Sequence, residues 1–425
     1  MPGLLSTRQE LLSEVRGQTL VLPDLWQYCS HWPQAVNPGL DRLRQDVNDW
    51  LDSAIPSEKL RKAFKIADIG LLGACVYPFA SYDRLRIAAL LNIWIFIVDD
   101  ELDMESGTMV DDLETSNRYR AELVDFVRRC LGLADADDAN EDDDDVDEQR
   151  QQPKSGVNDT GYSHIIQSFA MLGREIQAAY NLEQRHRLLD NVIFYLGMTR
   201  EEQCSRLAGG IPSPEEYWKF RDGASAVEVC LAMVEYLADA SGLPKQVFDD
   251  PDMKKLWTLT NTNVSLSVVQ QHPARHRREL GESELTSCCP SVNDVFSAKK
   301  ELVRNQSSRS TTKRIASMGK ASLTQKTSRT QAGESIANAI PIWYAAAPSG
   351  SDRMQAATDR AVAMFVRTVG EVDDLARKLM LRYGNGRLLD DHLTKELQWF
   401  IDGCRTWCTG NYYWRYVRAL LIDPF

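Results

Sequence analysis

The chain has 425 residues, of which 43% are hydrophobic, and a formal net charge of −12. This length and apolar content allow one large domain or two ordinary ones with a substantial core. No stretch reaches the roughly 18 uninterrupted apolar residues that a membrane span needs, which excludes an integral membrane helix. The first residues lack the basic and apolar regions of a secretory signal. The scattered cysteines predict reduced thiols, and we expect a cytoplasmic protein.

The negative charge is concentrated in one tract. Residues 135–148 carry ten acidic side chains and no basic one, so the rest of the chain has a net charge of only about −2. A block of like charges repels itself and stays solvated. We interpret 134–160 as an acidic disordered loop, and a tail that binds a basic partner is the alternative.

Helical periodicity dominates the chain. In 39–55 the residues Leu40, Leu43, Val47 and Leu51 fall on one helical face. The segment 85–103 is apolar nearly all round, as expected for a helix inside a bundle. A helix over 213–239 is predicted to begin with a capping box, and no segment shows a strand pattern. The other expected helices are 163–180, 185–209, 352–380 and 390–421. The sequence therefore predicts an all-α bundle of about ten helices in a single domain, 1–425.

Two further stretches do not fit a bundle. Residues 267–292 separate two good helical segments and form an atypical insertion. Residues 304–332 are rich in Ser, Thr, Lys and Arg and contain no acidic residue, which predicts a disordered insertion. A nucleic-acid-binding arm is the less favoured reading of 304–332, because no aromatic residues are interleaved with its basic ones. We expect no nucleic-acid partner.

The apolar segment 93–98 ends abruptly in the carboxylates of "DDELD", residues 99–103. On a helix Asp99 and Asp103 share a face, with Asp100 beside them. Carboxylates this close repel one another unless a cation neutralises them, and such hard oxygen ligands suit Mg²⁺. A solvated acidic helix end is the alternative. The preceding apolar run favours a functional site, because charges that face a bundle interior must be compensated.

A second group of oxygen ligands occurs in "NDVFSAKKE", residues 293–301. Asn293, Ser297 and Glu301 are spaced four residues apart and form one stripe of a helix. An amide, a hydroxyl and a carboxylate on one stripe make a mixed oxygen site for a second divalent ion.

Together these motifs resemble those of class I terpene synthases (terpene cyclases), of the single-domain fungal sesquiterpene type. The resemblance rests on "DDELD" at 99–103, "NDVFSAKKE" at 293–301 and "PSPEEYWKFRDGAS" at 212–225. It implies a class I terpenoid synthase helical bundle that ionises and cyclises a prenyl diphosphate, with farnesyl diphosphate as the expected substrate. The implied product is a sesquiterpene hydrocarbon or alcohol, with release of diphosphate.

The resemblance also implies roles for individual residues. Three Mg²⁺ ions are expected, with Asp99 as the main aspartate ligand of two of them. Asp100 and Asp103 would act mainly through hydrogen bonds and charge, whereas the third ion would be held by Asn293, Ser297 and Glu301.

The diphosphate would be bound by basic residues. Lys300 would contact it, and Arg221 resembles the arginine that senses it, with Ala224 and Ser225 at the linker and effector positions. The family also carries an Arg-Tyr pair near its C-terminus, to which Arg415 and Tyr416 correspond. Here the pair follows Trp414 directly, whereas in relatives it usually lies several residues farther on.

Aromatic faces stabilise carbocations, and Phe96, one turn before the aspartates, is the best candidate for a wall of the site. Trp407 and Trp414 are weaker candidates, with ordinary core packing as the alternative for each.

The insertions bear on this assignment. Arg221 and Asn293 are farther apart than their counterparts in the family, by about the length of 267–292. We interpret 267–292 and 304–332 as translated introns or lineage-specific loops.

Two competing functions stay open. A prenyl elongating transferase would need a second DDxxD motif, which "EVDDLAR" at 371–377 does not supply. A catalytically inactive protein of the same fold is supported by the insertions. The expected oligomeric state is monomer or homodimer.

Overall fold

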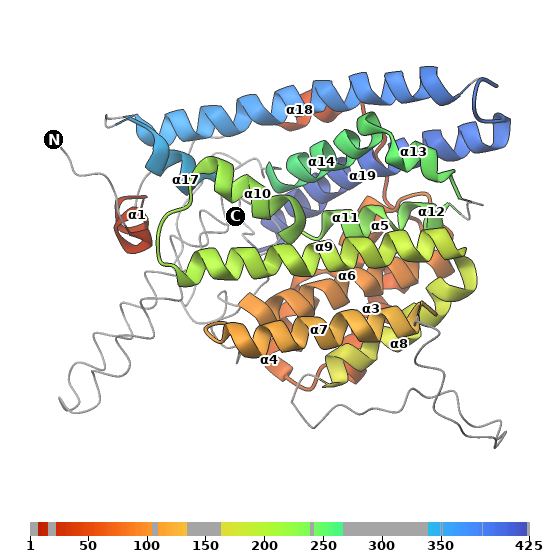
Figure 1. Ribbon diagram of the computed structural model, residues 1–425, viewed down its shortest axis with the longest axis horizontal. Coiled ribbons are helices and arrows are strands. Elements are labelled where there is room, and N and C mark those ends of the chain that lie inside the picture. The colour runs from red at the N-terminus through yellow and green to blue at the C-terminus, as the bar shows by residue number, and fades with distance from the viewer. Residues whose placement is uncertain are drawn as a thin grey trace.

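A computed structural model describes residues 7–15, 23–103, 109–133, 163–238, 242–266, 339–348, 350, 352–384 and 386–422. Every regular element in these ranges is a helix, which confirms the all-α prediction (Figure 1). The stretches 134–160, 267–292 and 304–332, which we interpreted as loop and insertions, lie outside the described residues. None of the described helices combines the length and the apolar character required to cross a membrane.

The N-terminal half begins with short helices and then builds the centre of the bundle. The helices are α1 (Arg8–Val15), α2 (Trp26–Cys29), α3 (Leu40–Ala54), α4 (Glu58–Ala67), α5 (Ile69–Val76), α6 (Tyr82–Asp103), α7 (Leu113–Cys130) and α8 (Ser163–Ala179). All residues of α5 are buried, and α6 packs against α3, α5, α8 and α12. The predicted central helix is therefore α6, because an all-round apolar surface is stable only when neighbours cover every side.

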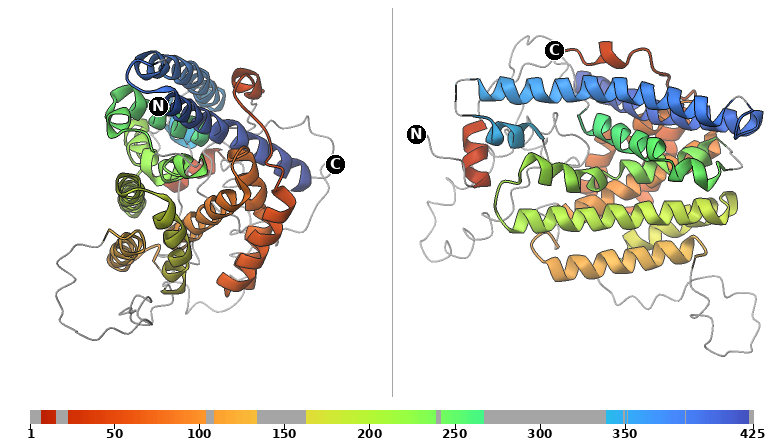
Figure 2. Two further views of the ribbon diagram at one scale, coloured as in Figure 1. Left: turned by 90° about the vertical axis from the view of Figure 1, so that its right-hand side faces the viewer. Right: turned by 45° about the horizontal axis from the view of Figure 1, so that its top comes forward.

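The C-terminal half surrounds this centre. Its helices are α9 (Leu182–Leu207), α10 (Pro214–Ala224), α11 (Val227–Leu231), α12 (Val234–Leu237), α13 (Lys245–Asp249), α14 (Pro251–Leu266), α17 (Ala339–Ala346), α18 (Arg353–Tyr383) and α19 (Asp391–Ile422). Long α9 and α18 run along the length of the molecule, and α18 lies over α14 (Figures 1 and 2). α19 packs closely on α5, where a side chain at Gly410 would collide with the Cys75 carbonyl.

The capping box predicted at the start of α10 is confirmed. The Ser213 Oγ accepts a hydrogen bond from the Glu216 backbone N–H (3.2 Å), and the Glu216 Oε2 accepts one from the Ser213 N–H (2.8 Å). Pro214 occupies the first turn, where its missing N–H costs nothing.

The prediction of one continuous helix over 213–239 is wrong. The structure divides it into α10, α11 and α12, and the first break lies at Ser225 and Ala226. Ala226 has a left-handed backbone with φ of 57°, which ends helical geometry and is costly for a residue with a Cβ. Hydrogen bonds between Asn261 on α14 and the residues Asp222 and Ser225 hold this break in place.

Helix α7 was not predicted. Its apolar stripe, which includes Tyr119, Leu123 and Phe126, is interrupted by Ser116 and Arg120. Both polar residues are buried, because they bond to α9 across the helix interface. A periodicity search counts such residues as solvent-facing and therefore loses the helix.

Candidate active site

The acidic motif closes the central helix. Asp99 and Asp100 lie in the last turn of α6 and are only 4% and 5% exposed. The C-terminal end of a helix carries partial negative charge, so a cation is stabilised there. Burial also raises the pKa of the neighbouring Glu101 carboxyl. This end of α6 is therefore suited to binding positive charge.

The chain that follows the motif is fastened to α9. Gln203 donates from Nε2 to the carbonyl oxygens of Met109 (3.0 Å) and Val110 (3.2 Å), and Arg206 donates to Val110 O (2.9 Å). The Gln203 Oε1 accepts from the Arg120 guanidinium on α7 (2.9 Å). All these contacts are buried, so they fix the start of α7 relative to α9.

Arg221 lies at the C-terminal end of α10, one turn before the helix break, and is only 2% exposed. The break is bonded to α14 through Asn261. Ser225 Oγ donates to Asn261 Oδ1 (2.6 Å), and Asn261 Nδ2 donates to the Asp222 backbone carbonyl and to Asp222 Oδ1 (3.2 Å). One amide side chain thus bonds both sides of the last turn of α10 and sets where Arg221 sits.

Two carboxyls flank this break. Burial raises the pKa of Asp222, and burial together with the nearby Asp222 raises the pKa of Glu228 to about 8. At neutral pH Glu228 therefore carries a proton, which avoids a second buried negative charge beside Asp222.

Arg415 is buried on α19 and is linked to the end of α14. Its Nε donates to Asn411 Oδ1 (3.2 Å), and Asn411 Nδ2 donates to the Val264 carbonyl (3.4 Å) in the last turn of α14. The cation is thus placed beside the point where the described part of α14 ends.

A family model described as terpene synthase family 2, C-terminal metal binding, matches residues 91–267. This range contains both the buried carboxylates of α6 and Arg221. Sesquiterpene cyclase hepA from Aspergillus oryzae is 29% identical over 287 residues, or 68% of this chain and 73% of that protein. Terpene cyclase braA from Annulohypoxylon truncatum is 24% identical over 232 residues, or 54% of this chain and 56% of that protein.

Solved structures show the same fold. Hedycaryol synthase in complex with HEPES aligns with a TM-score of 0.63 and 16% identity, over 94% of this chain and 100% of that chain. Germacradien-4-ol synthase from Streptomyces citricolor aligns with a TM-score of 0.58 and 18% identity, over 94% and 99%.

Together, the comparisons and the helical fold support a class I terpene synthase. The enzyme class predicted from its motifs is thereby confirmed. Several predicted site residues of the synthase nevertheless lie outside the described structure. They are Asn293, Ser297, Lys300 and Glu301, together with the side chains of Asp103 and Tyr416.

The described residues of the synthase fit a divalent cation at the end of α6. Asp99 and Asp100 supply hard carboxylate oxygens in a buried position, and such oxygens are the ligands that Mg²⁺ prefers. Within the described ranges no group of three or more His, Cys, Asp or Glu side chains gathers as a complete metal site. The other predicted ligands lie outside the described structure; they are the side chains of Asp103, Asn293, Ser297 and Glu301.

The aromatic candidates differ in their surroundings. Phe96 is buried on α6, one turn before Asp99. Trp407 packs edge-on against Tyr77, with ring centroids 5.6 Å apart at 76°. Trp414 donates from Nε1 to the carbonyls of Ala67 (3.0 Å) and Asp68 (3.1 Å), which favours a packing role for this side chain.

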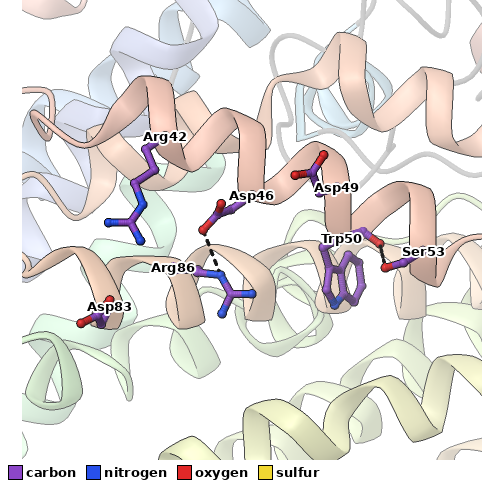
Figure 3. Close-up of a pocket in the computed structure, with 7 residues that line it drawn as sticks. All are labelled: Arg42, Asp46, Asp49, Trp50, Ser53, Asp83 and Arg86. Atoms are coloured by element: carbon purple, nitrogen blue, oxygen red, sulfur yellow. Dashed lines mark hydrogen bonds and ion pairs between the residues drawn. The ribbon is translucent and has the colours of Figure 1, made fainter.

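A surface cavity of about 520 Å³ lies at the other end of α6, between this helix and α3 (Figure 3). Its lining residues are Arg42, Asp46, Asp49, Trp50, Ser53, Asp83 and Arg86, and Asp46 is paired with Arg86 (3.1 Å). Asp83 and Asp99 are separated by about 24 Å of helix, so the cavity is distinct from the candidate active site.

Sequence reasoning missed Asn261 and Asn92, which the structure places at the helix break and on the central helix. One signal was available for Asn261. Four polar residues follow one another in α14, whose C-terminal part is buried: Thr260, Asn261, Thr262 and Asn263. Consecutive buried polar residues require partners, and such a run therefore marks a contact between helices.

Proposed function

We propose that this synthase uses Mg²⁺ to ionise farnesyl diphosphate and cyclises the resulting cation to a sesquiterpene. The observation that carries the proposal is the pair of buried carboxylates, Asp99 and Asp100, at the end of an apolar central helix. An all-hydrocarbon chain with an anionic head group matches an apolar interior that ends in a cation-binding rim. The named activities of hepA and the other relatives support the same substrate class.

The carboxylates of α6 would hold Mg²⁺ together with Asp103, and Asn293, Ser297 and Glu301 would hold a third ion. When bound, the ions supply positive charge that stabilises the departing diphosphate. Arg221, Lys300 and the pair Arg415 and Tyr416 would bind the remaining phosphate oxygens. Arg221 and Arg415 are both buried, and a buried guanidinium is well suited to bidentate phosphate binding.

The helix break would couple binding of diphosphate to closure of the site. Arg221 lies one turn before Ser225, and Ser225 is bonded to Asn261 on α14. α14 leads toward the segment that contains the predicted third metal site. A ligand held by Arg221 would therefore restrain both helices, while Phe96 would present an aromatic face to the cation.

The test is a product assay on the purified full chain with farnesyl diphosphate and Mg²⁺. Released diphosphate is measured in solution, and a solvent overlay is analysed by gas chromatography–mass spectrometry. We expect a sesquiterpene that is absent with Asp99→Ala but present with Asp41→Asn, a change at a fully exposed carboxylate on α3.

Other results would redirect the assignment. Longer prenyl diphosphates made after addition of isopentenyl diphosphate would indicate an elongating transferase. Absence of both diphosphate release and terpene, with geranyl and geranylgeranyl diphosphates as well, would indicate an inactive protein of this fold.

A further inference from the structure

Asn92 is a buried amide within the apolar part of α6, and it is only 2% exposed. Two side chains from other segments point their donors at its carbonyl oxygen. The Tyr77 hydroxyl lies 3.5 Å and the Cys230 thiol 3.4 Å from Asn92 Oδ1. Tyr77 follows α5 and Cys230 belongs to α11, so three separate elements meet at one amide.

One of the two polar atoms of this amide has no hydrogen-bond partner among the residues that the structure describes. Asn92 Nδ2 is fully buried and has no protein partner, although it carries two donors. Exchanging the assigned positions of the amide oxygen and nitrogen does not solve this. Tyr77 and Cys230 both lie beside one of the two amide atoms, so the exchange would leave the oxygen without a partner in place of the nitrogen. Burial raises the pKa values of Tyr77 and Cys230, so both keep their protons. An unsatisfied buried amide of this kind is destabilising, so a further polar partner is expected beside it.

The position of Asn92 relates it to the candidate active site. Asn92, Phe96 and Asp99 are spaced by four and three residues and lie on one stripe of α6. The amide is therefore about 10 Å along the helix from the carboxylates. Cys230 belongs to the short helix that follows the break at Ser225, beyond Arg221. The cluster thus lies at the depth that the hydrocarbon end of a prenyl chain would reach.

A hydrocarbon substrate offers this amide no acceptor, whereas a water molecule does. A buried water needs two to four polar partners. Asn92 Nδ2 would donate to it, and the Tyr77 oxygen and the Cys230 sulfur, whose protons point to Asn92 Oδ1, would offer lone pairs as acceptors. Such a water would be the one polar reactant beside an otherwise apolar substrate.

We propose that Asn92 is a positioning residue that holds a water molecule for capture of the final carbocation, so that the product is a sesquiterpene alcohol. This inference rests on the proposed function. The water oxygen donates a lone pair to the cationic carbon and forms the C–O bond. The oxonium then loses one proton, which the diphosphate released in the ionisation step takes up.

The experiment repeats the reaction of the full chain in water labelled with heavy oxygen. The alcohol and hydrocarbon fractions are quantified for the natural chain, Asn92→Leu and Tyr77→Phe. We expect a labelled alcohol from the natural chain and a fall of about tenfold in the alcohol-to-hydrocarbon ratio with Asn92→Leu. Tyr77→Phe keeps the ring and should lower the ratio in the same direction. Thr358→Val, a buried change on α18 that removes only a bond to Met354 O, should leave the ratio unchanged.

The experiment distinguishes failure of the proposed water site from failure of the proposed cyclase activity. Diphosphate release with hydrocarbon as the sole product of the natural chain would overturn the water site and leave the cyclase assignment intact. An unchanged ratio in Asn92→Leu would also overturn it, and Tyr77→Phe gives the same decision if Asn92→Leu does not fold. No diphosphate release by the natural chain would overturn both proposals.

Discussion

The Oγ of Ser225 lies 2.6 Å from the Oδ1 of Asn261, and this hydrogen bond connects the break after α10 to α14. The same amide bonds Asp222 on the preceding turn. A helix break that carries a left-handed alanine is stable only when its surroundings hold it, and Asn261 supplies that restraint.

Replacing Asn261 by Leu should therefore lower stability by about 2–3 kcal/mol, because it leaves the Asp222 carbonyl and the Ser225 hydroxyl without this partner. Diphosphate release should fall as well, since Arg221 loses its fixed position. The measurements are urea unfolding and steady-state kinetics. Thr262→Val is the matched control, because Thr262 bonds only to its own helix at Thr258 O. Equal effects of the two changes would argue against a special role for Asn261.

A double-mutant cycle extends this test. Ser225→Ala and Asn261→Leu remove the same hydrogen bond, so their combined effect should be smaller than the sum of the single effects. Strict additivity would show that the contact contributes nothing in solution.

Asp99→Asn should abolish product formation, because it removes a carboxylate ligand of the proposed Mg²⁺. Mg²⁺ with inorganic diphosphate should raise the melting temperature of the natural chain but not that of the variant. Differential scanning fluorimetry measures this ligand-induced shift, with Asp41→Asn as the control. A full ligand-induced shift in Asp99→Asn would contradict the metal site.

Glu228 should make stability depend on pH. Its pKa rises from 4.5 to about 8 on folding, so between these values the folded state holds a proton that the unfolded state has lost. Stability is then greatest below about pH 4.5 as far as this group is concerned, and it falls as the pH rises toward 8. Glu228→Gln should flatten this slope and stabilise the protein at pH 8 by roughly 1–3 kcal/mol.

The measurement is urea unfolding at a series of pH values. Glu58→Gln, at an exposed glutamate in the first turn of α4, should keep the slope of the natural chain. A steep slope that persists in Glu228→Gln would assign the pH dependence to other groups.

Deleting residues 267–292 should preserve folding and strengthen the Mg²⁺ dependence. The deletion joins Leu266 to Asn293, which places Asn293 one turn after Asn263 on the same stripe of α14. Shortening a loop changes closure entropy little, so the melting temperature should stay within a few degrees. We expect half-maximal activity at a lower Mg²⁺ concentration than for the natural chain.

Deletion of the acidic stretch 134–160, which joins α7 to α8, is the matched control and should leave the Mg²⁺ requirement unchanged. Loss of diphosphate release on deletion of 267–292 alone would show that this segment belongs to the working enzyme and is not a misread intron.

The long helices and one cap were predictable because local patterns encode them. Central α6 followed from its continuous apolar run, and the start of α10 followed from Ser213, Pro214 and Glu216. The break at Ser225 was not predictable in this way, because Gly223 lies within α10 itself and no proline marks the position where the helix ends. It depends on the amide of Asn261, which comes from a helix 36 residues farther along the chain.

The sequence by itself determined the helical class, the enzyme family and the identity of the acidic motif, because these depend on periodicity and on residue types at short spacing. The tertiary structure alone decided which polar residues are buried together. The donors of Tyr77 and Cys230 meet the amide of Asn92 only after α6, α11 and the end of α5 pack together, because Asn92 and Cys230 are 138 positions apart in the chain. Such contacts leave no local pattern, because their stability arises from the low dielectric and the exclusion of water in the packed interior.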